Sequence, residues 1–166
     1  MKRLLTLDEK NYPESFPVHE RFNVRGVILR DGMLAMERSR MGEYKFPGGG
    51  VDPGEELEAA LCREVQEETG LVVIPSSIRP FGEIYEKRLD IYTKDSIYLC
   101  HSLYYTCEVE ERTVEPDRTE SEIRQGYVLS WATPDEIMQS NQCFAQKKWI
   151  SRDTAFLKLW LEGAVR

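Results

Sequence analysis

The chain has little histidine and little cysteine for its 166 residues. The two histidines, His19 and His101, and the four cysteines form no C-x-x-C pair and no zinc-type spacing. A zinc site or a disulfide framework is therefore disfavoured, and the composition predicts reduced, partly buried thiols in a cytoplasmic protein. The cysteines are Cys62, Cys100, Cys107 and Cys143.

Long apolar runs are also missing. No stretch approaches the length of a transmembrane helix, so we expect no membrane partner. The apolar pair Leu4 and Leu5 is followed at once by charged residues from Asp8, which is too short a run for a signal peptide. Repeats, low-complexity tracts and Ser/Gly-rich linkers are absent as well. We expect one domain over residues 1–166, in which residues 1–15 form an N-terminal arm.

Positive charge is scarce. The chain carries 22 Lys and Arg against 29 Asp and Glu, which gives a net charge of −7 and a pI near 5.0. An acidic surface repels nucleic acid and anionic membranes, so nucleic acid is not an expected partner. An anionic small molecule would need local help from a metal ion or a basic pocket.

The pattern along the chain mixes strands and helices. Asp31-Gly32 predicts a hairpin between strands at 20–30 and 33–38. Leu57, Leu61 and Val65 mark the buried stripe of a helix that should end at Gly70. This order predicts a central mixed sheet with helices packed against it. Further expected elements are a short strand at 44–46, an antiparallel pair at 82–91 and 96–108, a mobile loop at 110–119, a strand at 126–131, a capping box at Thr133 and a last helix at 146–161.

One face of the helix at 56–69 is strongly acidic. Glu64, Glu67 and Glu68 stand at i, i+3 and i+4, so all three project from the same face. Three neighbouring carboxylates repel one another unless a cation neutralises them, and hard divalent cations prefer carboxylate oxygens. On its own the helix could equally be a solvated charged surface in which Arg63 pairs with Glu67.

The residues before the helix favour the metal site. Gly49, Glu55 and the run from Arg63 to Leu71 match every defined position of the Nudix box, with a chance probability on the order of one in a billion in one register. The lead-in Phe46-Pro47-Gly48-Gly49 is also similar to this family. The resemblance implies an α/β fold, an α/β/α sandwich around a mixed β-sheet. It also implies hydrolysis of a nucleoside diphosphate linked to another moiety X, with Mg²⁺ or Mn²⁺ as cofactor.

The resemblance also assigns roles to the residues of the box. It implies that Glu64, Glu67 and Glu68 bind the metal, with the carbonyl of Gly48 as a further ligand. Arg63 is expected to orient the carboxylates. Glu55 is expected to fasten the loop to the helix at the edge of the metal cluster.

Residues outside the box are less well determined by the sequence. Many family members use a further carboxylate, and Glu122 is the preferred candidate here because it lies in a segment that could close over the site. Glu83, Glu86 and Glu120 are the alternatives. Arg25, Arg38 and Lys45 are candidates for binding the phosphates of the substrate.

Two other functions share parts of this sequence pattern. An isoprenoid diphosphate isomerase shares a degenerate box, which the intact box of this chain disfavours. A non-catalytic, Nudix-like module that senses a nucleotide derivative usually loses box carboxylates, and here they are present. The marks that distinguish subfamilies are absent, so the identity of X stays open. Because many relatives are dimers, a homodimer is a further prediction.

Overall fold

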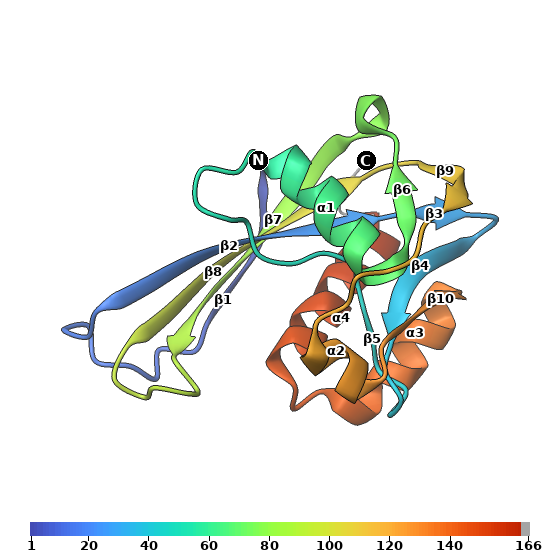
Figure 1. The fold of residues 1–166 in the computed structure, drawn as a ribbon. Helices are drawn as coiled ribbons and strands as arrows, with labels where there is room; N and C mark the ends of the chain where they lie inside the picture. Colours follow the sequence, from blue (N-terminus) through green and yellow to red (C-terminus); the bar gives the residue numbers. More distant parts are fainter. Residues whose placement is uncertain (164–166) are drawn as a thin grey trace.

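The structure, a computed structural model, describes residues 1–163. Its main sheet has four strands in the order β1-β7-β8-β2. Strands β1 and β7 are parallel, β7 and β8 are antiparallel, and β8 and β2 are parallel. One end of this sheet projects beyond the helices (Figure 1). The strands are β1 (Arg3–Asp8), β2 (Val18–Val27), β7 (Arg79–Leu89) and β8 (Ile97–Thr106).

Two smaller sheets complete the β structure. One has the order β10-β4-β3, with β5 paired to β4, and the other pairs β6 with β9. All of these pairings are antiparallel. The strands are β3 (Leu29–Arg30), β4 (Met33–Arg38), β5 (Tyr44–Lys45), β6 (Leu71–Val73), β9 (Val109–Thr113) and β10 (Val128–Ala132).

Helices lie on both sides of the strands, and two apolar cores result. Helix α1 packs against β2 through the core that contains Val24, Leu61 and Val65. Helices α3 and α4 pack on the other side, around Tyr104 and Phe156 (Figure 1). This arrangement confirms the predicted α/β architecture. The helices are α1 (Leu57–Thr69), α2 (Glu120–Gln125), α3 (Pro134–Asn141) and α4 (Lys148–Leu161), with 3₁₀ turns η1 (Pro75–Ser77) and η2 (Gln142–Phe144). Among residues 1–163, no helix is long and apolar enough to cross a membrane.

Local signals in the sequence identified several elements correctly. Helix α1 ends where Gly70 adopts a left-handed conformation. The Asp31-Gly32 turn joins β3 and β4, with both residues at positive φ. Thr133 caps α3 in the predicted capping box.

Two expectations were wrong. Residues 3–8 do not form an arm but an edge strand, because β1 pairs with β7 and places Leu4, Leu5 and Leu7 against the core. The segment 110–119 is not one mobile loop, because β9 pairs with β6 over its first part. Both strands depend on partners that are distant in the sequence, and neither has a local pattern strong enough to reveal them.

Candidate active site

The glycine loop between β5 and α1 lies against β2. The amide of Val24 donates to the carbonyl of Gly49 at 2.9 Å, and the amide of Gly26 donates to the carbonyl of Pro47 at 2.8 Å. Gly48 has a φ of 133°, and a Cβ there would overlap the carbonyl of Val24. A Cβ on Gly49 would overlap the carboxylate of Glu64. Glycine is therefore required at position 48 for the loop to fit against β2, whereas a side chain at position 49 would displace the carboxylate of Glu64.

Arg63 connects this loop to the acidic helix. Its Nε and Nη2 each donate to Glu55 at 2.8 Å, and Nη2 also donates to the carbonyl of Gly50 at 3.1 Å. Its Nη1 donates to Glu64 at 2.7 Å and to Glu67 at 3.2 Å. The hydrogen bonds from Arg63 and from the amide of Asp52 lower the pKa of Glu55 to about 2. Arg63 thus contacts three carboxylates at once, and its role as an orienting residue stays a prediction.

Glu68 lies deeper than the other two glutamates of the box. One of its oxygens accepts a hydrogen bond from the amide of Gly48 at 2.6 Å, and the other accepts one from Lys45 at 3.0 Å. Lys45 Nζ also forms an ion pair with Glu37 Oε2 at 2.8 Å. Within residues 1–163, no hydrogen bond is directed at either carboxylate oxygen of Glu37, which is fully buried. Burial, together with the negative charge of Glu37, raises the pKa of Glu68 well above its usual value. Burial alone would lower the pKa of Lys45, but Glu68 and Glu37 raise it overall.

Glu122 lies close to the same lysine. Its Oε1 is 3.9 Å from Lys45 Nζ, and its Oε2 accepts hydrogen bonds from the amide and hydroxyl of Thr119 at 2.8 and 2.9 Å. Burial opposes ionisation, but the hydrogen bonds from Thr119 outweigh it and lower the pKa of Glu122. The alternative carboxylates have other surroundings: Glu83 pairs with His101 and Arg3, and Glu86 pairs with Arg88 and lines a neighbouring cavity. Glu120, in the first turn of α2, is exposed and does not line the cavity that contains Glu122.

Two of the three candidate phosphate-binding residues line the same cavity, and the third lies outside it. Arg25 is buried, and its Nη1 donates to the carbonyls of Phe46 and Gly48. Arg25 and Lys45 both line a cavity of about 440 Å³ beside the glycine loop. Arg38 instead lies over the ring of Tyr44 at 5.7 Å and is not part of that cavity lining.

The donor set of the site suits a hard divalent cation. Glu64 and Glu67 share one guanidinium nitrogen of Arg63, so their carboxylates lie on the same side of α1. Burial raises the pKa of Glu64, Arg63 opposes this rise and Glu67 adds to it. The site offers carboxylate and carbonyl oxygens as donors, and oxygen-only donors fit Mg²⁺ or Mn²⁺. Within residues 1–163, however, no three carboxylate, thiol or imidazole side chains converge as a ready metal-binding group. Arg63 and Lys45 neutralise the carboxylates in this arrangement.

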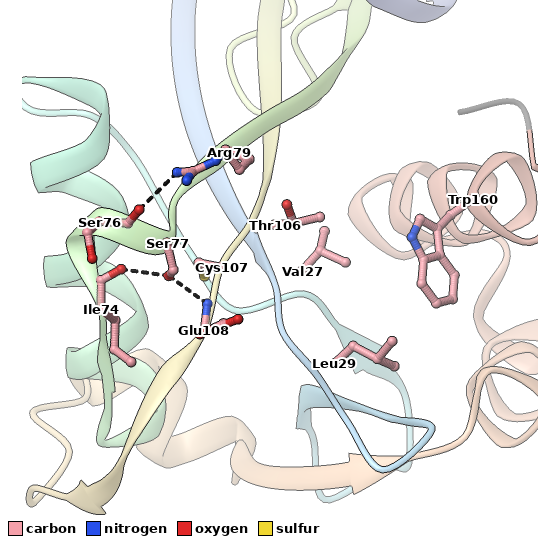
Figure 2. Close-up of a pocket in the computed structure, with 10 residues that line it drawn as sticks. All are labelled: Val27, Leu29, Ile74, Ser76, Ser77, Arg79, Thr106, Cys107, Glu108 and Trp160. Carbon is pink, nitrogen blue, oxygen red and sulfur yellow. Dashed lines mark hydrogen bonds between the residues drawn. The ribbon is translucent and has the colours of Figure 1, made fainter. Parts of the chain in front are cut away.

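A larger cavity, of about 630 Å³, lies away from this chemistry. Its polar groups are engaged with one another: Arg79 donates to the carbonyl of Ser76, and Ser77 links Ile74 to Glu108 (Figure 2). Its lining includes neither Lys45 nor Glu122, whereas the 440 Å³ cavity contains both, and Lys45 is in contact with Glu68 of the box. Size alone therefore does not locate the site, and the carboxylate cluster does.

Several residues at the site were not predicted from the sequence. Glu37, on β4, is the fully buried partner of Lys45. Arg21, Trp149 and Arg152 line the cavity that also contains Lys45 and Glu122. The available signal was weak: Glu37 continues the apolar run 33–36, where a charge at a core position is unusual.

Comparison with known proteins agrees with this geometry. The NUDIX domain profile matches residues 19–153. The chain belongs to the NUDIX family. Nucleoside triphosphatase NudI of Escherichia fergusonii is 33% identical over 113 residues, which cover 66% of this chain and 75% of that protein. The Escherichia coli O1:K1 protein of the same name is 31% identical over 110 residues, covering 64% and 73%.

Solved structures support the fold of this NUDIX enzyme. A NUDIX hydrolase from Nitrosomonas europaea superposes with a TM-score of 0.58 at 20% identity and covers 75% of this chain and 79% of its own. The E. coli ORF135 protein has a TM-score of 0.53 at 19% identity, with 93% and 96% covered. The family membership and the intact box confirm the prediction that the chain is a pyrophosphohydrolase.

Proposed function

We propose that this NUDIX enzyme uses Mg²⁺ or Mn²⁺ to hydrolyse a phosphoanhydride bond in a nucleotide, either a nucleoside diphosphate linked to X or a nucleoside triphosphate. The observation that carries the proposal is the Arg63 network, which holds Glu55, Glu64 and Glu67 next to the glycine loop. A bound divalent cation would withdraw charge from the phosphate oxygens and acidify the attacking water.

The residues of the site divide this work. Glu64 and Glu67 would hold the cation, with Glu68 and the carbonyl of Gly48 as further ligands. Arg63 and Glu55 would hold the loop in a fixed position relative to the carboxylates of α1, because hydrogen bonds join the two residues.

Groups beyond the box would act on the substrate itself. Arg25 and Lys45 would neutralise the phosphate groups that enter the adjoining cavity. Although burial opposes ionisation, hydrogen bonds from Thr119 lower the pKa of Glu122, which favours its carboxylate form, and Glu122 lies at the same cavity. It would take the proton of the attacking water, which is the role that needs a carboxylate near the reacting phosphorus.

The substrate is best sought among nucleotides. The similarity to proteins named nucleoside triphosphatase makes nucleoside triphosphates the first compounds to test. A panel of nucleoside triphosphates, nucleotide sugars, dinucleoside polyphosphates and coenzymes, each with Mg²⁺ or Mn²⁺, should identify at least one that is cleaved. No turnover of any compound with either ion would overturn the proposed function.

Glutamine variants test the roles of the carboxylates. Glu67→Gln should lower kcat by about 100-fold or more, because a ligand charge is lost next to the reacting groups. Glu122→Gln should also lower kcat and flatten the acid limb of the pH–rate profile. Glu120→Gln, in the first turn of the same helix α2, is the matched control and should leave activity unchanged. Normal kcat in Glu67→Gln would remove Glu67 from the site, and normal kcat in Glu122→Gln would do the same for Glu122.

A further inference from the structure

Two adjoining cavities form a continuous cleft next to the glycine loop. Their volumes are about 440 and 260 Å³, and they share four lining residues, Arg21, Tyr92, Trp149 and Arg152. The first cavity begins at Lys45 and Glu122, which belong to the carboxylate cluster. The second leads away from it, towards the ends of β7 and β8. A molecule lying in this cleft would therefore have one end at the glutamates and the other end in the second cavity.

The cleft is basic in an otherwise acidic protein. Six cationic and three anionic side chains line the two cavities, whereas the whole chain has a net charge of −7. Within residues 1–163, Arg21 and Arg25 form no ion pair, and Arg25 Nε is buried without a hydrogen-bond partner. Arg152 is buried and is bound by the neighbouring carboxylate of Asp153 at 3.1 Å. Arg21 Nε donates to Asn23 Oδ1 at 3.1 Å, and Arg25 Nη1 donates to two backbone carbonyls, so neither guanidinium charge is neutralised by a carboxylate. Guanidinium groups without a carboxylate partner in a cleft are suited to phosphate oxygens.

Aromatic side chains stand where the two cavities meet. Trp149, at the start of α4, is half-buried, and Tyr92, in the turn between β7 and β8, is 83% exposed. Trp149 and Tyr92 each contribute to the lining of the first and of the second cavity. The faces of these two rings at the cleft are available to stack on a flat ligand. A nucleobase is such a ligand, whereas a purely phosphorylated sugar or polyol is not.

We infer that this cleft is the specificity site for a nucleoside polyphosphate: Trp149 and Tyr92 bind the base, and Arg21 and Arg152 bind the phosphate chain between the base and the glutamates. The inference rests on the proposed function, because the phosphates end at the same carboxylates. Arg88 and Tyr98 line the second cavity, into which the base would extend. Residues outside the Nudix box thus select the nucleoside.

Tryptophan fluorescence can locate the base directly. The experiment uses the Glu67→Gln background with Mg²⁺, and ATP, GTP, CTP and UTP as probes. At least one nucleotide should quench the emission, and the quenching should disappear in Trp149→Phe. Trp160→Phe is the matched control, because Trp160 lines the distant cavity and its loss should leave the quenching intact. Quenching that persists in Trp149→Phe, or no binding of any of the four nucleotides, would overturn the inference.

Calorimetry separates the two halves of the ligand. Trp149→Ala should weaken nucleoside triphosphate binding about tenfold through lost stacking, and should leave the Kd of inorganic tripolyphosphate unchanged. Arg21→Met should weaken both ligands about tenfold or more, since a charge-assisted hydrogen bond is lost. Arg30→Met is the control, because Arg30 is exposed and lies over Trp131, outside the cleft. Equal effects of Trp149→Ala on both ligands would refute the division of roles.

The outcomes also distinguish this inference from the proposed function. Nucleotide binding that depends on Trp149, without turnover in the wild-type chain, would leave the cleft assignment standing and reject hydrolysis. Turnover with an unchanged KM in Trp149→Ala and Arg21→Met would reject the cleft assignment and leave hydrolysis standing.

Discussion

Lys45 is the cation on which two buried carboxylates depend. It lies 2.8 Å from Glu37 and 3.0 Å from Glu68, and both partners are almost completely buried. Removing one partner of a buried ion pair leaves an uncompensated charge and typically costs about 3–5 kcal/mol. We therefore expect Lys45→Met to lower the free energy of unfolding by about that amount at pH 7, as measured by urea denaturation.

The loss of stability in Lys45→Met should depend on pH. Burial and Glu37 already raise the pKa of Glu68, so a carboxyl in this pocket is easily protonated. Protonation removes the unpaired charge, and the loss of stability in Lys45→Met should be smaller at pH 5 than at pH 7. The double variant Lys45→Met/Glu37→Gln should recover part of the loss. A double variant no more stable than the single one would show that Glu37 is not the group Lys45 neutralises.

The residues of the box were predictable and their partners were not. The spacing of Glu64, Glu67 and Glu68 places them on one helix face through local geometry alone. The contact of Lys45 with Glu68 joins residues 23 positions apart, and it forms only once β5 and α1 are packed. No periodicity encodes such a contact, so Glu37 and Arg21 could not be assigned to the site from the sequence.

At the scale of the element, the end of α1 depends on Gly70. This residue has a φ of 76°, and a Cβ there would overlap the carbonyl of Val114. Gly54 is a matched control, since its φ is 80° but nothing lies within 4 Å of an added Cβ. Gly54→Ala should cost about 1–2 kcal/mol from the left-handed backbone alone. Gly70→Ala should cost about 2–4 kcal/mol, because the overlap adds to that strain. Equal urea midpoints for the two variants would show that the overlap is relieved without cost.

Elements with local signals were predicted well, and those without them were missed. Helix α1, the Asp31-Gly32 turn and the α3 capping box each carry a pattern that is complete within a few residues. Strand β9 carries the polar sequence Val-Glu-Glu-Arg-Thr, and only its pairing with β6 makes it a strand. Strand propensity depends on such neighbours more than on the residues themselves.

At the scale of the whole molecule, the described fold extends beyond the residues that the family profile matches. The NUDIX domain profile begins at residue 19, whereas β1 occupies residues 3–8 and pairs with β7 along its length. Strand β1 covers an edge of the main sheet that would otherwise be unpaired. The predicted homodimer and cytoplasmic location remain predictions, and light scattering of the purified chain would test the first.

The contribution of β1 to the whole molecule can be measured with two substitutions on the same strand. Leu4 packs so closely on β7 that a Cβ on Gly82 would overlap it, and it belongs to the core around Ile84 and Phe156. Leu4→Ala should lower the free energy of unfolding by about 1–3 kcal/mol, because a partly buried side chain leaves a cavity. Thr6→Ala, on the exposed face of β1, should change it by less than about 0.5 kcal/mol. If both variants have the unfolding free energy of the wild type, β1 does not contribute to stability. A lower value for Leu4→Ala than for Thr6→Ala would show that β1 belongs to the cooperatively folding unit that supports the cleft.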